Sequence, residues 1–132
     1  MNQGALKILK TLYRKIRPAD NSIASNLRTW SEWDWSKGGE EWTNSQDWKE
    51  SLVQHVLEPN IPVGSQGLEI GPGGGRWTEF LIQRASHLTI VDLTPKCIEV
   101  CRARFERATN IEYHVNDGCD LSFIPSQSID RI

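Results

Sequence analysis

The stretch Leu68-Glu69-Ile70-Gly71-Pro72-Gly73-Gly74-Gly75 ends a short apolar run and opens a turn that contains four glycines. Glycine lets a ligand approach the backbone closely, and the N-terminus of a following helix offers free N–H groups to an anion. Nicotinamide, flavin, nucleotide and adenosylmethionine sites all use such a turn after the first strand of a β-α-β unit. The stretch therefore predicts a ligand site at the end of a strand.

The sequence around this turn alternates β-type runs with helical runs. Strands are predicted at 68–70, 88–91 and 111–115, with helices at 76–85 and from Thr94-Pro95 to about residue 107. Residues 129–132 are expected to open a fourth strand. This order predicts an α/β fold with a parallel sheet and crossover helices, and we expect the chain to be truncated after the start of the fourth strand.

The glycine spacing separates the cofactor classes. A dinucleotide fingerprint counted from Gly71 needs a third glycine at the position of Arg76. A Walker A loop needs Gly-Lys followed by Ser or Thr, whereas this loop continues with Arg76-Trp77-Thr78. The carboxylate of Glu69 at the strand end suits a ligand that carries positive charge better than a pyrophosphate.

Two further strand ends carry acids. Asp92 ends the second predicted strand, where a carboxylate can accept hydrogen bonds from both ribose hydroxyls of an adenosine ligand. It could equally be a turn or capping residue before Thr94-Pro95. Asn116-Asp117-Gly118 follows the third strand, and Asp-Gly is also an ordinary turn pair.

Taken together, these landmarks resemble the class I S-adenosylmethionine-dependent methyltransferases. Glu69 to Gly75 resembles their first motif, Asp92 agrees with the second, and residues 121–123 with 128–132 resemble the approach to the fourth strand. The resemblance covers roughly residues 64–132 and implies a Rossmann-like fold with S-adenosylmethionine as cofactor. It implies these cofactor-binding residues: Glu69, Gly71 and Gly73 at the methionine part, Asp92 at the ribose, Leu93 at the adenine ring, and Asp117 with Gly118 at the adenine amino group.

The N-terminal part, residues 1–63, is expected to form a helical and irregular extension of the domain at 64–132, and it could act as a lid. Residues 3–17 form a basic amphipathic pattern, which indicates a helix that packs on protein or lies on a membrane surface. Residues 18–44 are rich in tryptophan without helical or strand period, so they either fold over a ligand or anchor the extension. A helix is predicted to start after Ser45, to present Trp48, Leu52 and Val56 on one face, and to be ended by Pro59 and Pro62.

Composition and charge narrow the class of protein and its partners. With 132 residues, 38% hydrophobic and 24% charged, the chain is expected to be one soluble, cytoplasmic domain without a spanning or signal segment. The net charge of -2 divides into +5 for residues 1–17 and -7 for the rest, so the acidic body argues against nucleic acid as a partner. Cys97, Cys101 and Cys119 lack metal-ligand spacing; we expect reduced thiols, with Cys97 and Cys101 in packing, and no metal site.

The expected function is S-adenosylmethionine-dependent methyl transfer to a small-molecule, lipid or sugar acceptor, or the cofactor-binding part of such an enzyme. Two alternatives stay open: an NAD-dependent oxidoreductase domain, and a non-catalytic fragment that binds a cofactor or a partner. No catalytic residue is assigned, because in the family the groups that align the acceptor follow the fourth strand. His87 and His114 border strands and are interpreted as packing or surface residues.

Overall fold

The centre of the molecule is a parallel sheet of three strands. The computed structural model describes residues 21–132; the helix predicted at 3–17 lies outside the described residues. The strands are β1 (Gln66–Ile70), β2 (His87–Asp92) and β3 (Ile111–Val115), and they pair in the order β1-β2-β3. The α/β prediction and its three strands are confirmed.

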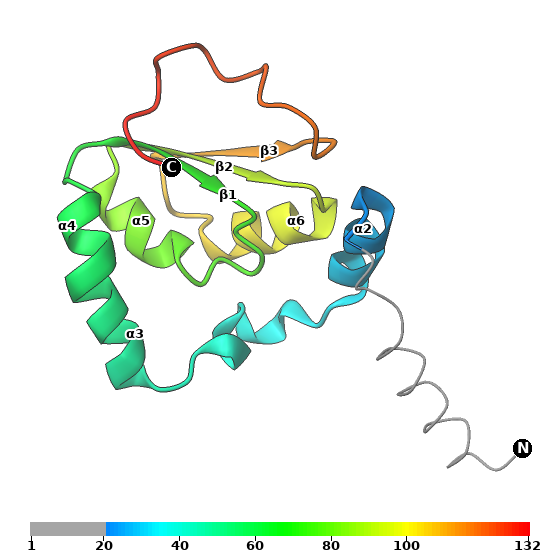
Figure 1. The fold of residues 1–132 in the computed structure, drawn as a ribbon, viewed down its shortest axis with the longest axis horizontal. Helices are drawn as coiled ribbons and strands as arrows, with labels where there is room; N and C mark the ends of the chain where they lie inside the picture. Colours follow the sequence, from blue (N-terminus) through cyan, green and yellow to red (C-terminus); the bar gives the residue numbers. More distant parts are fainter. Residues whose placement is uncertain (1–20) are drawn as a thin grey trace, which may run out of the picture.

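Two helices connect the strands and lie on the same face of the sheet, as Figure 1 shows. They are α5 (Thr78–Arg84) and α6 (Pro95–Arg104). Apolar side chains of β2 and α6 meet between the layers and form the core with Ala85: Leu88, Ile90, Ile98 and Cys101 are all buried. Helix α6 ends three residues earlier than predicted, because Phe105 leaves helical geometry at φ -112° and ψ 32°.

The chain returns to the free edge of β1 at its C-terminal end. Arg131 forms a parallel bridge with Gly67, and its carbonyl accepts a hydrogen bond from the Leu68 N–H at 2.9 Å. The Asp130 carboxylate also accepts from the Gln66 N–H at 2.8 Å. Of the predicted fourth strand, the described residues show only this single bridge. It lies at the edge of β1 that faces away from β2.

The tryptophan-rich segment is more regular than predicted. It contains α2 (Ile23–Glu32) and two short 3-10 turns, η1 (Trp35–Lys37) and η2 (Glu40–Trp42). The prediction of no helical period was wrong for α2, which begins after the N-cap Ser22. Its apolar residues Ile23, Leu27 and Trp30 do have the i, i+4, i+7 spacing of a helix. Ile23 and Leu27 nevertheless stay 45% and 37% exposed.

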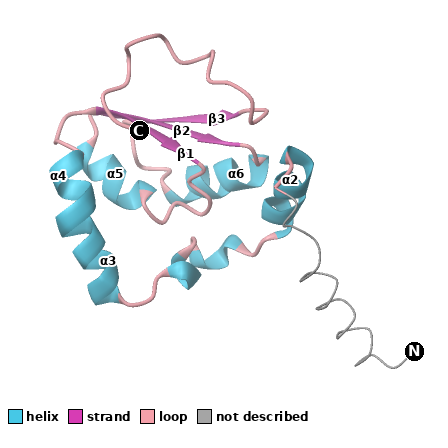
Figure 2. Cartoon of the chain, in the orientation of Figure 1, coloured by secondary structure: helices cyan, strands magenta, loops and turns pink. Residues whose placement is uncertain are grey.

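The next helix starts as predicted and ends at Asn60, between the two prolines that were predicted to end it. Ser45 caps α3 (Gln46–Leu52) by accepting from the Trp48 N–H at 3.1 Å, and the helix continues as the π segment η3 (Val53–Leu57) and as α4 (Glu58–Asn60). Pro59 therefore lies inside the helix instead of ending it. Pro59 has no N–H to donate, and it follows the π segment directly, at whose end the Glu58 N–H donates to the Val53 carbonyl. Figure 2 shows this helical column beside the α5 layer.

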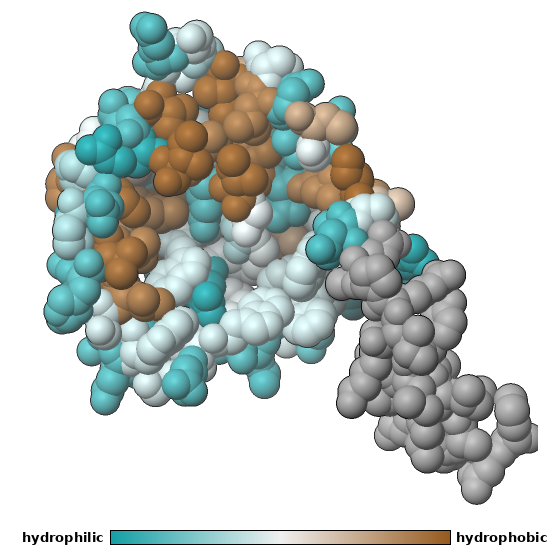
Figure 3. Space-filling model, viewed as in Figure 1, coloured by the Kyte–Doolittle hydropathy of each residue, from teal (hydrophilic) through white to brown (hydrophobic). Residues whose placement is uncertain are grey.

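Hydrophobic side chains also reach the surface. Figure 3 shows them gathered over the strands in this view, and the exposed ones include Ile70, Val115 and Phe123. Within residues 21–132, no helix is both long enough and apolar enough to cross a membrane.

Candidate cofactor site

The glycine turn connects β1 to α5 at the carboxyl end of the sheet. Gly71 and Gly73 have φ values of 72° and 56°, in the left-handed region that favours glycine. The Gly71 N–H donates to the Val91 carbonyl at 2.8 Å, which fixes the start of the turn to β2. A Cβ on Gly71 would meet nothing within 4 Å, so this part of the turn is open to a ligand.

Four tryptophans cover the other side of the turn. Trp30, Trp33, Trp35 and Trp42 form one cluster, here called the tryptophan cluster, whose ring centroids lie 5.1 to 6.5 Å apart. Trp35 is buried, and its Nε1–H donates to the Trp30 carbonyl at 3.0 Å. Its ring packs on the turn so closely that a Cβ on Gly73 would lie 2.8 Å from two of its carbons.

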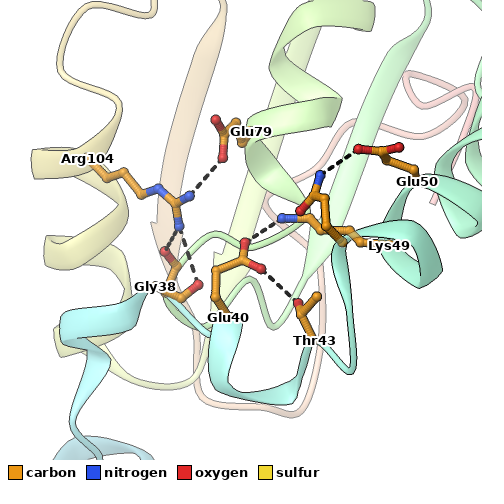
Figure 4. A network of polar contacts seen from close by, with 9 residues as sticks. Gly38, Glu40, Thr43, Lys49, Glu50, Glu79 and Arg104 are labelled. Carbon is orange, nitrogen blue, oxygen red and sulfur yellow. Dashed lines mark hydrogen bonds and ion pairs between the residues drawn. The ribbon is translucent and has the colours of Figure 1, made fainter.

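Basic side chains of α6 fix this N-terminal segment to the sheet layer. The Arg104 guanidinium donates to the carbonyls of Gly74 at 3.0 Å and Gly38 at 3.3 Å, and it pairs with Glu79 at 2.8 Å (Figure 4). Lys96 donates to the Ser31 and Trp33 carbonyls, at 3.0 and 2.8 Å. The segment is thus held at both ends of α6.

A second polar group orders the segment internally. Figure 4 also shows Glu40 between Lys49, with which it forms an ion pair, and the hydroxyl of Thr43, which donates to it at 2.7 Å. These bonds hold the pKa of Glu40 below its usual value despite partial burial, which acts in the opposite direction. The turn that carries Trp42 is therefore tied to α3 as a charged pair.

A cavity of about 720 Å³ lies between the tryptophan cluster and the carboxyl ends of the strands. Ligands of open α/β sheets bind at this end of the strands. The wall combines the glycine turn with residues from α2, the 3-10 turns and the loops after β2 and β3. The residues that line the cavity include Trp30, Trp35, Trp42, Gly71, Gly73, Arg76, Trp77, Asp92, Leu93, Asn116, Gly118, Cys119 and Asp120.

Five of the seven residues predicted for cofactor binding line this cavity: Gly71, Gly73, Asp92, Leu93 and Gly118. Asp92 is 8% exposed at the end of β2, and its Oδ1 accepts from the Thr94 N–H at 2.7 Å. Burial raises the pKa of this carboxyl, and the hydrogen bond from Thr94 opposes the shift. Its position agrees with either interpretation, ligand binding or capping, because Thr94 also precedes α6.

The other two predicted residues are turned elsewhere. Glu69 lies behind the glycine turn, where its Oε2 accepts from the Thr78 hydroxyl at 2.6 Å. Burial raises its pKa to about 7; the Thr78 bond lowers it and the charge of Asp92 raises it. Asp117 accepts from the Cys119 N–H at 2.9 Å, and its neighbours Asn116 and Asp120 line the cavity in its place.

Sequence reasoning missed several wall residues. Arg76 entered it only as the position that breaks the dinucleotide spacing, yet Arg76 and Trp77 both line the cavity. Their place directly after the glycine turn was the signal that could have found them. Residues 21–132 contain no group of three or more metal-ligating side chains placed to hold an ion.

The cysteines and histidines lie largely as expected. Cys97 and Cys101 are buried, which confirms their packing role, and burial raises the pKa of each thiol to about 12. His114 on β3 and His87 on β2 lie 2.9 and 3.5 Å from the carboxylate of Glu112, outside the cavity.

Comparison with known proteins agrees with this geometry. A family described as "Methyltransferase domain" matches residues 68–132. The demethylmenaquinone methyltransferase of Tropheryma whipplei (strain Twist) is 31% identical over 72 residues, 54% of this chain and 29% of the relative. The ubiquinone biosynthesis O-methyltransferase of Xanthomonas axonopodis pv. citri is 29% identical over 81 residues, 61% of this chain and 34% of the relative.

Shorter matches include a probable ribosomal RNA small subunit methyltransferase A of Methanosarcina mazei, 41% identical over 56 residues, 42% of this chain and 21% of the relative. This chain therefore spans about a third or less of the relatives' length. Among solved structures, the N-methyltransferase NodS from Bradyrhizobium japonicum WM9, in complex with S-adenosyl-L-homocysteine, superposes with a TM-score of 0.52 at 25% identity. That match covers 70% of this chain and 46% of NodS. Residues 68–132 with their Rossmann-like sheet belong to the class I S-adenosylmethionine-dependent methyltransferase family.

Proposed function

We propose that the chain binds S-adenosylmethionine in the cavity and forms the cofactor-binding part of an enzyme that methylates a small-molecule, lipid or sugar acceptor. One observation carries the proposal: the cavity joins an open, left-handed glycine at residue 71 to a buried carboxylate at the end of β2. That pair suits an adenosine ligand whose ribose lies at the carboxylate.

Each wall residue then has a part in binding. Gly71 and Gly73 lie under the methionine part, Asp92 accepts from the ribose hydroxyls, and Leu93 with Gly118 flanks the adenine ring. Glu69 and Asp117 are proposed to act at the methionine part and the adenine amino group, after exchanging the partners that they now hold. When bound, the sulfonium of the cofactor supplies an activated methyl group, and the chain aligns it.

The described part of the N-terminal extension, residues 21–63, is proposed to close the cavity as a lid. The tryptophan cluster supports this, because three of its rings line the cavity while Arg104 and Lys96 hold the segment in place. Trp42 keeps 44% of its surface exposed, which leaves an indole face for an apolar or planar acceptor. The names of two relatives, a demethylmenaquinone methyltransferase and a ubiquinone biosynthesis O-methyltransferase, agree with such an acceptor. The match to a ribosomal RNA methyltransferase favours the alternative of an RNA acceptor.

Calorimetric titration with S-adenosylmethionine, S-adenosylhomocysteine and NAD tests the proposal. We expect heat with both sulfur ligands and none with NAD. Asp92→Ala should weaken both by at least about tenfold, the cost of losing charged hydrogen bonds, and Asp92→Asn keeps an acceptor for the Thr94 N–H as a check on the fold. Asp47→Ala, an exposed acid in the first turn of α3, is the matched control. Binding of NAD alone would contradict the proposal.

A further inference from the structure

Arg76 carries a polar atom that the protein itself leaves unsatisfied. Its Nη1 is buried and has no hydrogen-bond partner among the described residues. Its guanidinium carbon lies over the Trp77 ring, 4.7 Å from the ring centroid, which is a cation–π contact and not a hydrogen bond. A buried charged donor without a partner is destabilising, so this atom needs an acceptor from outside the described residues.

The cavity is where such an acceptor can come from. Arg76 lines the cavity, and among the described wall residues it is the only cation. The two acids of the wall, Asp92 and Asp120, already accept the backbone N–H groups of Thr94 and Ser122. Neither carboxylate accepts a hydrogen bond from the buried Nη1 of Arg76, which has no partner among the described residues.

The surroundings fix the guanidinium in place. The side chain packs against the Gly39 turn, where a Cβ would come 3.5 Å from the Cβ of Arg76, and the guanidinium lies over the Trp77 ring. The N–H groups of a guanidinium form a planar fork that matches the two oxygens of a carboxylate. Preorganisation of this kind favours a fixed ligand group over mobile water.

We propose that Arg76 is the receptor for a ligand carboxylate in this cavity. The inference rests on the proposed function for the identity of the ligand, and two sources share the chemistry: the aminocarboxylate end of the cofactor, or a carboxylate on the acceptor. The glycine motif ends at Gly75, so it gives Arg76 no role in binding.

The experiment compares ligands with and without the carboxylate. S-adenosylhomocysteine and 5′-methylthioadenosine share the adenosine and the thioether sulfur, but only the first has a carboxylate. Both are titrated into the full chain, its Arg76→Met and Arg76→Lys variants, and Arg102→Met as the control. Arg102 also lies over a ring, that of Tyr113 at 4.5 Å, but outside the cavity.

If the cofactor supplies the carboxylate, Arg76→Met weakens S-adenosylhomocysteine by about tenfold to a hundredfold and leaves 5′-methylthioadenosine unchanged. Arg76→Lys should lie between, because it keeps the charge and loses the fork. If the acceptor supplies it, S-adenosylhomocysteine affinity is unchanged, and the saturated wild-type chain binds benzoate but not benzamide, with the benzoate binding lost in Arg76→Met.

Three results overturn the inference. One is an equal loss for both nucleosides in a variant with native circular dichroism, which would make Arg76 a support of the glycine turn. Another is unchanged S-adenosylhomocysteine binding together with benzoate binding that is absent or independent of Arg76. The third is an equal loss in Arg102→Met. Failure of the wild type to bind either nucleoside would instead refute the proposed function, and benzoate titrated without a nucleoside would still test Arg76.

Discussion

Replacing Gly73 by alanine tests whether the tryptophan cluster and the glycine turn pack as one unit. The added Cβ would lie 2.8 Å from two carbons of the Trp35 ring, at a residue whose φ is 56°. A non-glycine residue in the left-handed region costs roughly 1–2 kcal/mol, and overpacking a buried contact costs roughly a further 1–3 kcal/mol. Gly73→Ala should therefore lower the free energy of unfolding by about 2–5 kcal/mol.

Gly71→Ala is the matched control. Gly71 has a φ of 72°, but a Cβ there meets nothing within 4 Å, so only the backbone cost of roughly 1–2 kcal/mol applies. Urea unfolding of the ligand-free chains, followed by tryptophan fluorescence and by far-UV circular dichroism, measures both. In a Trp35→Phe background, which removes the outer edge of the indole, the Gly73→Ala penalty should fall to that of Gly71→Ala. Equal penalties for the two glycines, or no relief from Trp35→Phe, would refute the packing argument.

Three further outcomes are expected. Arg104→Met should lower the free energy of unfolding in urea by about 1–2 kcal/mol, because it removes the charged donors to the Gly38 and Gly74 carbonyls. Glu79→Gln removes only the exposed ion pair and should lower it by under about 1 kcal/mol. Equal losses would contradict the role of Arg104 in joining these two turns. Because the pKa of Glu69 is raised to about 7, the free energy of unfolding should fall as pH rises from about 4.5 to 7. In this range the folded state holds a proton that the unfolded chain has lost. If the same pH dependence of the free energy of unfolding persists in Glu69→Gln, this carboxyl is not its source. An alkylating reagent should modify only Cys119 at pH 8, since the other two thiols are buried, and S-adenosylhomocysteine should slow the reaction because Cys119 lines the cavity; modification at an unchanged rate would place the ligand elsewhere.

Local pattern was enough to predict the sheet. The strand 111–115 agrees with β3 residue for residue, and the other two strands were found within two residues at each end. Each strand is a short β-type run between turn residues, so local preference and burial agree. Asp92 was found for the same reason: the end of a strand is a local feature, and parallel strands bring their ends to one edge.

Contacts between distant parts of the sequence could not be predicted in this way. Trp35 meets Gly73, and Arg104 meets Gly38, only because the N-terminal segment crosses the turn after folding. Helix α2, by contrast, carried a local signal that was missed: Ile23, Leu27 and Trp30 have the i, i+4, i+7 spacing of an amphipathic helix. The side-chain directions of Glu69 and Asp117 depend on Thr78 and on the Cys119 N–H, which no motif encodes.

The glycines of the turn are required for two different reasons. A Cβ on Gly74 would come 2.6 Å from the backbone of Gly38, and one on Gly75 would come 2.6 Å from the ring of Phe105. Both therefore make room for protein, whereas Gly71 faces open space. Ligand binding alone explains a glycine only at the start of the turn, and the later ones admit the Gly38 turn and α6. It follows that part of what resembles a cofactor motif in this chain is a packing requirement, and that changes at Gly74 or Gly75 should appear first as lost stability and only secondarily as lost ligand affinity.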